Sequence, residues 1–175
     1  MREILFRGKR LDNGEWVHGA YSAYDSRLTY YNGQVECEVA FMPSIIAYDD
    51  ECFWYHVDPA TVGQYTGLTD KNGKRIFEGD IVKQTFEKTV SIVSADLYDG
   101  DEYEDLYGED VGVVVILPSK GACIKNPVIH REINGEITQD GEVAKMYKNI
   151  CSGRCEIIGN IHDNPELLEG GVNDG

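Results

Sequence analysis

The stretch TVGQYTGLTDKNGKRIFEGDIV, from Thr61 to Val82, is the strongest indication of fold class in the sequence, because it combines turn signals with β-prone residues. At its centre stands Asn72-Gly73, and a type I turn closed by a glycine in the left-handed region commonly joins two strands across such a sequence. The apolar residues of RIFEGDIV favour strands beyond this turn, whereas Gly79 interrupts them where a bulge or a sharp bend is expected. The stretch therefore predicts a hairpin followed by a barrel corner.

The same turn signal recurs at Asn13-Gly14, Asn32-Gly33 and Asn134-Gly135, each time between runs rich in β-prone residues. Asparagine followed by glycine between such runs is a strong hairpin signal. The run VGVVVIL, residues 111–117, is typical of a strand buried on both faces. These signals predict a mainly β protein with a small SH3-like or similar β-barrel, with an α+β fold as the alternative.

Helical signals are short. Asp58-Pro59 and Asn164-Pro165 each place a capping side chain before a proline, which predicts two helical turns. The segment EVAKMYK, residues 142–148, has apolar residues on one helical face and is a candidate for a third.

The chain has 175 residues, of which 42% are hydrophobic, so it can form one domain or two small ones. We expect an N-terminal β-hairpin region over 1–53, a β-barrel region over 54–169 with an acidic insertion over 96–110, and a disordered tail over 170–175. Its start does not resemble a signal peptide, and no run approaches the roughly 20 apolar residues of a membrane span. We therefore expect a cytoplasmic protein.

The five cysteines are odd in number and irregularly spaced, which is not typical of a secreted disulfide framework. A zinc site would need Cys37 or Cys52 to join Cys151 and Cys155 from far away in the sequence. Buried, reduced thiols are the favoured interpretation, and no metal or cofactor is expected.

Charge excludes one class of partner. The chain has 31 acidic and 16 basic residues and a formal net charge of -15. Affinity for nucleic acids depends mainly on Lys and Arg that neutralise phosphates. Direct binding to duplex nucleic acid is therefore not expected.

Much of the negative charge lies in DLYDGDEYEDLYGED, residues 96–110, which holds eight acids and no base. Such a segment repels itself, so we expect a protruding or mobile loop, favoured as a solvated insertion between strands. It does not fit the EF-hand pattern. Alternatively, tyrosines among carboxylates imitate nucleic acid and occupy a basic groove on a host protein. The candidate binding residues are Tyr98, Asp99, Asp101, Glu102, Tyr103, Glu104, Asp105 and Tyr107.

An enzyme is the less favoured hypothesis. His162 and Asp163 could form an acid and base set or a metal site with Asp80 and Glu78, as in a metal-assisted hydrolase. Adjacent residues in a strand point to opposite faces, however, so Asp163 does not simply orient His162. The chain has no nucleophile elbow, phosphate-binding loop or HExxH motif.

Binding to another protein is favoured instead. Several tyrosines beside the hairpin edges of the first third could support self-association or recruitment of a partner, and strand edges must be covered, charged or paired. A homo-oligomer is consistent with this pattern. These tyrosines are Tyr21, Tyr24, Tyr30, Tyr31, Tyr48 and Tyr55.

The chain resembles the YopX family of bacteriophage and prophage proteins in four segments, EILFRGKRLDNGEWVHG, VDPATVGQYTGLTDKNGKRIFEGDIV, GVVV and IIGNIHDNPELLE. They cover residues 1 to about 21, 54–82, 111–124 and 155–169 in the family's order and spacing. Residues 23–53 and 125–150 are poorly covered, and the acidic tract resembles an insertion.

The resemblance implies a β-rich protein encoded in phage or prophage genomes, with no established biochemical activity and no catalytic residues. The residues most like the family are types that build turns and caps, so a structural role is their favoured interpretation. We therefore expect a non-catalytic interaction with a phage or host protein. These structural residues are Gly63, Gln64, Tyr65, Thr66, Gly67, Asn72, Gly73, Gly79, Asp80, Gly159, Asn160, Asn164 and Pro165.

Overall fold

The computed structural model describes residues 4–31, 34–48, 52–92 and 102–168. It is built almost entirely of antiparallel strands, which confirms the predicted mainly β class. The chain divides into two compact units, residues 1–67 and 68–175, at a point inside one strand. In the described ranges, no helix is long and apolar enough to cross a membrane.

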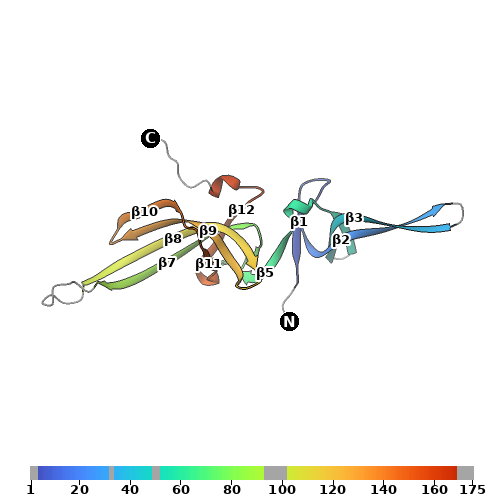
Figure 1. Ribbon diagram of the computed structural model, residues 1–175. Helices are drawn as coiled ribbons and strands as arrows, with labels where there is room; N and C mark the ends of the chain where they lie inside the picture. Colours follow the sequence, from blue (N-terminus) through green and yellow to red (C-terminus); the bar gives the residue numbers. More distant parts are fainter. Residues whose placement is uncertain (1–3, 32–33, 49–51, 93–101, 169–175) are drawn as a thin grey trace. The chain divides into compact units, whose positions relative to one another are not determined.

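The first unit is a sheet in the order β4-β3-β2-β1-β5. Its elements are β1 (Phe6–Lys9), β2 (Trp16–Tyr31), β3 (Gln34–Tyr48), β4 (Cys52–His56), η1 (Pro59–Thr61) and the first part of β5 (Gly63–Thr69). Figure 1 shows β2 and β3 as one long hairpin. The hairpin predicted at Asn13-Gly14 is confirmed, with Gly14 at φ 74°. The turn at Asn32-Gly33 lies outside the described residues.

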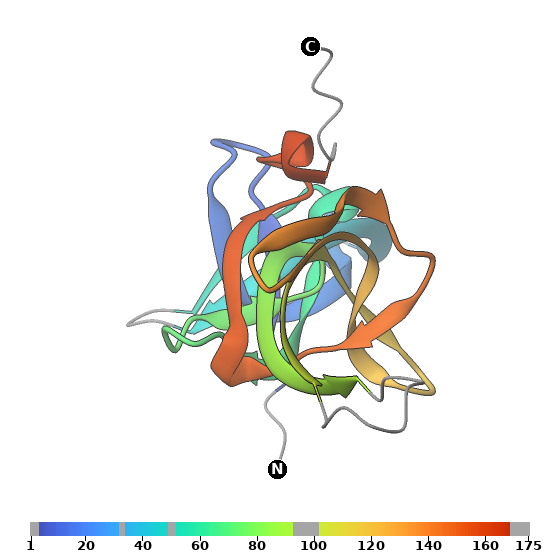
Figure 2. The same ribbon diagram turned by 90° about the vertical axis from the view of Figure 1, so that its left-hand side faces the viewer.

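The second unit contains the end of β5, the short strand β6 beside it, and a sheet in the order β10-β9-β8-β7-β12, with β11 paired to β9. Figure 2 shows that this sheet curves strongly, with β12 (red-orange) beside β7 (light green). The elements are β6 (Arg75–Phe77), β7 (Asp80–Ile92), β8 (Glu102–Leu117), β9 (Gly121–Ile133), β10 (Glu136–Val143), β11 (Tyr147–Asn149), η2 (Ser152–Arg154), β12 (Cys155–Asn160) and η3 (Pro165–Leu168).

The core of the second unit lies between these strands. Val82 on β7, Val114 on β8 and Ile124 on β9 are fully buried and pack together with Ile76 and Cys155. Val114 belongs to the run VGVVVIL, and its pairing with Ile124 places both side chains on the same face of the sheet. The expectation of a buried strand at 111–117 is thus correct for the inward-facing residues.

The predicted closed barrel is wrong. Among the described strands, the second sheet runs from β10 to β12 without a β10–β12 pairing that would close it. Hairpin turns and bulges curve a sheet whether or not its edges meet, so these signals do not distinguish an open, curved sheet from a barrel.

The turns of the opening stretch are as predicted. Gly73 has φ 81° in the turn between β5 and β6, and Gly79 has φ 82° in the bend between β6 and β7. At the β9–β10 hairpin, Asn134 and Gly135 both have positive φ, at 50° and 84°. Positive φ at both central residues of a two-residue hairpin loop is the pattern that Asn-Gly favours.

Both predicted helical turns are confirmed as 3-10 turns, η1 and η3, and the Asp58 side chain accepts a hydrogen bond from the Ala60 N–H at 2.9 Å. The candidate helix at 142–148 is wrong, because β10 continues to Val143 and β11 begins at Tyr147. Backbone bonds to β9, from the Ala144 N–H to the Pro127 carbonyl and from the Asn126 N–H to the Met146 carbonyl, replace the helical ones.

Candidate interaction surfaces

The edge strand β4 of the first unit carries exposed aromatic side chains. Phe53 and Trp54 are 46% and 52% exposed, although they are large and apolar. The Arg10 guanidinium carbon lies 4.3 Å from the centroid of the Tyr55 ring, which holds that ring beside the β1–β2 turn. We call Phe53, Trp54 and Tyr55 the aromatic edge. A hollow beside it is lined by Leu11, Asp12, Met42, Trp54, Tyr55 and His56.

Of the six tyrosines that the sequence indicated, only Tyr21 and Tyr55 have side chains in the described part of the chain. Tyr55 belongs to the aromatic edge and is half-buried. Tyr21 is also half-buried, with its ring centroid 5.5 Å from that of Phe6. The side chains of Tyr24, Tyr30, Tyr31 and Tyr48 lie outside the described part of the chain.

The acidic tract is not a loop over its described half. From Glu102 onwards it forms β8, which pairs with β7 in an unbroken register from Ile92↔Glu102 to Ile81↔Val113. The loop prediction for 102–110 is therefore wrong, since cross-strand hydrogen bonds order the acidic residues. One such contact joins the Thr89 hydroxyl to the Asp105 carboxylate at 2.9 Å. Tyr98, Asp99 and Asp101 lie outside the described residues.

Strand alternation sorts the tract into two faces. Tyr103, Asp105, Tyr107 and Glu109 share one face of β8. Of the candidate binding residues whose side chains are described, Glu104 has the opposite parity. The structure thus brings together Tyr103, Asp105 and Tyr107 and separates Glu104 from them.

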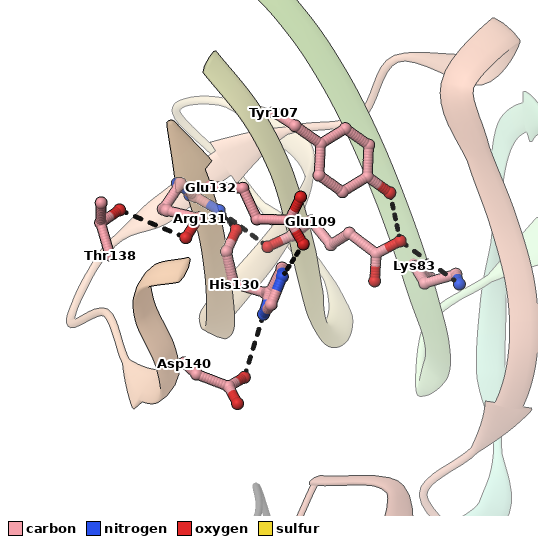
Figure 3. A network of polar contacts seen from close by, with 8 residues as sticks. All are labelled: Lys83, Tyr107, Glu109, His130, Arg131, Glu132, Thr138 and Asp140. Atoms are coloured by element: carbon pink, nitrogen blue, oxygen red, sulfur yellow. Dashed lines mark hydrogen bonds and ion pairs between the residues drawn. The ribbon is translucent and has the colours of Figure 1, made fainter. Parts of the chain in front are cut away.

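Figure 3 shows a polar network that includes Tyr107 and Glu109 of this face and extends over β7, β8, β9 and β10. The Tyr107 hydroxyl donates to Glu109 Oε1 at 2.5 Å, and Lys83 Nζ lies 3.6 Å from the same oxygen. The hydrogen bond to the Glu109 carboxylate, together with burial, raises the pKa of Tyr107 to about 12.

His130 occupies the centre of the network. Its Nε2 lies 2.9 Å from Glu132 Oε1 and its Nδ1 lies 3.1 Å from Asp140 Oδ1. The hydrogen bonds to Glu132 and Asp140 raise the pKa of His130 above its ordinary value. The sequence did not single out this histidine, because its partners are set by the β9–β10 register, in which Asp140 pairs with His130.

A second polar cluster surrounds the buried carboxylate of Asp110. Arg131 Nη2 lies 2.6 Å from its Oδ1, and Lys148 forms an ion pair with its other oxygen. Both cations also lie against Phe86, with the Arg131 guanidinium carbon 5.0 Å and Lys148 Nζ 4.6 Å from the ring centroid. A buried carboxylate with two cationic partners is the arrangement expected of a structural cluster. It joins β7, β8, β9 and β11.

The residues of the hydrolase hypothesis stabilise turns. Asp80 Oδ2 accepts a hydrogen bond from the Phe77 N–H at 2.7 Å, and Glu78 Oε1 accepts one from the Ile116 N–H at 3.3 Å. The N–H groups of His162 and Asp163 both donate to Asn160 Oδ1, at 2.9 and 3.0 Å. Across the described ranges, no group of three or more His, Cys, Asp or Glu side chains could hold a metal ion.

The residues assigned a structural role lie in strands and turns. Gly63 to Gly67 belong to β5, where Gln64 pairs with Phe6. Gly159 and Asn160 end β12, and the Asn164 N–H donates to the Asn160 carbonyl at 2.9 Å. Asn72, Gly73, Gly79, Asp80 and Pro165 occupy the turns and caps described above.

The described thiols are buried or half-buried. Cys123 and Cys155 are buried and Cys151 is half-buried, and all three are reduced. Burial raises the pKa of the Cys155 thiol to about 12, so the reactive thiolate is disfavoured at neutral pH. The side chains of Cys37 and Cys52 lie outside the described part of the chain.

An apolar groove opens on the second unit, with a volume of about 430 Å³. Val143 and Ile161 at this groove are 58% and 37% exposed. The groove is lined by Val113, Val115, Lys125, Asn126, Val128, Val143, Ile161 and Leu168.

Comparison with known proteins shows that the chain matches one family model. The model of the family described as "YopX protein" matches residues 5–169. No curated protein matches the chain. Among solved structures, protein EF1440 from Enterococcus faecalis is similar, with 19% sequence identity, a TM-score of 0.36, and coverage of 97% of this chain and 100% of that one.

Proposed function

The chain belongs to the YopX family, and from this premise we propose that it is a phage- or prophage-encoded, non-catalytic protein-interaction or assembly module of the bacterial cytoplasm. The aromatic edge carries the proposal. Large apolar side chains on an edge strand are costly to leave in water and offer both apolar area and a strand for pairing. Aromatic residues are also enriched at the centres of protein interfaces.

Affinity capture from extract of phage-infected cells tests this proposal. We expect the tagged wild-type chain to recover a defined protein or a second, differently tagged copy, and the double variant Phe53→Ser/Trp54→Ser to lose at least about nine tenths of it, as truncating hot-spot residues does. Ile4→Ser is the control, because Ile4 is also apolar and is 71% exposed. Recovery of nothing specific, or equal recovery by the double variant, contradicts the proposal.

A second candidate function is an inhibitor that imitates nucleic acid through the acidic tract. The unbroken β7–β8 register supports it, because it fixes the spacing of Asp105 and Glu109 on one face. For this function, we expect duplex DNA to compete with the chain for a captured basic protein, and Asp105→Asn/Glu109→Gln to weaken capture. Capture that DNA leaves unchanged contradicts it.

A further inference from the structure

One face of the second unit's sheet divides into two zones. The unbroken β7–β8 register places Asp105, Tyr107, Glu109, Val113 and Val115 on the same side of β8. Towards Glu102 this side is acidic and aromatic. Towards Leu117 it is apolar and becomes the groove.

The neighbouring strands continue both zones. Glu132 pairs with Tyr107, His130 pairs with Glu109, and Asp140 on β10 pairs with His130. Directly paired residues have their side chains on the same face. The acidic zone therefore consists of Glu87, Asp105, Tyr107, Glu109, Glu132 and Asp140, with Lys83 and His130 as its bases.

The apolar zone begins where Val111 pairs with Val128. A register shift follows between Val111 and Val113, and Asn126 on β9 has a φ of 42°. From Val111 to Arg131 the sequence has no acidic residue. None of the residues that line the groove is acidic, and Lys125 is its one charged residue among those described.

We propose that this face docks an extended, basic peptide segment of a partner protein, with apolar side chains in the groove and Lys or Arg side chains over the acidic zone. This inference rests on the proposed function and names the chemistry of a partner. Apolar burial supplies affinity, whereas the acidic zone steers the partner and fixes its direction along the strands.

Charge argues against a second copy as the occupant. The chain has a formal net charge of -15, so two copies repel each other and a second one brings further carboxylates towards the acidic zone. A basic partner is attracted by the same field. The single ammonium group of Lys125 is exposed and can turn towards solvent.

Two synthetic peptides test the inference, each with the same alternating Leu-Val centre and flanked by Lys residues in one and Glu residues in the other. Fluorescence anisotropy measures their binding to the full chain at low salt. We expect the Lys-flanked peptide to bind about tenfold more tightly, because opposite charges favour the complex. Equal binding of the two peptides, or tighter binding of the Glu-flanked one, overturns the inference.

Substitutions locate the binding. Val143→Asn and Ile161→Asn make the groove polar without changing its charge, and each is expected to weaken the Lys-flanked peptide about tenfold. Ile4→Asn is the matched control, because Ile4 is 71% exposed in the first unit, and it should leave binding unchanged. Glu132→Gln/Asp140→Asn should weaken only the Lys-flanked peptide. Groove variants that bind like the wild type overturn the inference.

Sedimentation of the same variants tests whether a second copy of the chain occupies the groove. Self-association that Ile161→Asn abolishes would assign the groove to a second copy and overturn the inference. The proposed function is tested separately through Phe53 and Trp54 on the first unit. If the peptides do not bind but capture still depends on Phe53 and Trp54, the docking of a basic peptide on the second unit is contradicted and the proposed function is not.

Discussion

At the residue scale, buried carboxylates hold the turns of the stretch that identifies the family. Asp70 accepts hydrogen bonds from the N–H groups of Asn72 and Lys74, both at 2.9 Å, and from that of Ile157 at 3.2 Å. Burial acts to raise the pKa of Asp70, but these three donors outweigh it and hold the pKa below its ordinary value. In the stretch 61–82, which resembles the family, Asp70 therefore has a structural role, because it holds the backbone of a turn.

We expect Asp70→Ala to lower the free energy of unfolding by about 1–3 kcal/mol, because three backbone N–H groups lose their acceptor. Urea denaturation measures this change. Asp12→Ala is the control, and it should have a much smaller effect, because its carboxylate is exposed and ion pairs at the surface contribute little to stability. Equal effects of the two substitutions would contradict the role of Asp70.

The Asp70 contribution should depend on pH. Because the pKa of Asp70 is lowered on folding, its ionised form stabilises the protein above the unfolded pKa of about 3.9, and this stabilisation is lost as pH falls through the folded pKa. The stability difference between the wild type and Asp70→Asn should therefore be largest near neutral pH and shrink in acid. A difference that grows in acid would contradict this assignment.

His130 should show the opposite dependence. Its raised pKa means that its contribution is present below the unfolded pKa of about 6.5 and lost as pH rises through the folded pKa. NMR titration should place the pKa of His130 above 6.5, and His130→Gln should destabilise the chain in mild acid more than in alkali. A titration midpoint below 6.5 would contradict the contacts with Glu132 and Asp140.

At the element scale, the packing of β7 against β8 depends on the close approach of the Phe86 ring to Gly108. A Cβ atom at Gly108 of β8 would lie 2.3 Å from Phe86 Cζ, so the Phe86 ring occupies the space above this glycine. The same ring contacts Arg131 and Lys148, the partners of buried Asp110. Gly108 thus links the packing of β7 on β8 to the Asp110 cluster.

We expect Gly108→Ala to cost about 1–3 kcal/mol of stability, measured by thermal and urea unfolding, because the ring must move. Gly153→Ala is a matched control, since a Cβ there meets no atom within 4 Å. In the Gly108→Ala background, Phe86→Leu should recover part of the loss by relieving the overlap. Additive losses of the two substitutions would argue against this packing.

Sequence reasoning predicted the elements whose geometry is local. Asn-Gly turns and the proline-led turns carry their own backbone preferences, so Gly73, Asn134 and Asp58 were placed correctly. The open sheet, the strand within the acidic tract and the surroundings of His130 depend on which strands pair and in which register. Those contacts join residues far apart in the chain, and alternation within one strand does not specify them.

At the scale of the whole molecule, charge and apolar surface are unevenly distributed. The formal net charge is -15, yet the groove of the second unit and the aromatic edge of the first present mainly apolar side chains. Such patches on an otherwise charged protein are typical of binding surfaces. The exposed aromatic edge is therefore the surface through which we expect the chain to bind a partner.

Hydrogen–deuterium exchange of the full chain, with and without the partner or second copy recovered by capture, measures whether the aromatic edge is the binding surface. We expect the amides of residues 52–57 to exchange more slowly in the complex, because a partner on the aromatic edge excludes water and pairs with β4. Unchanged exchange at 52–57, with new protection at 77–80 and 160–163 instead, would contradict it.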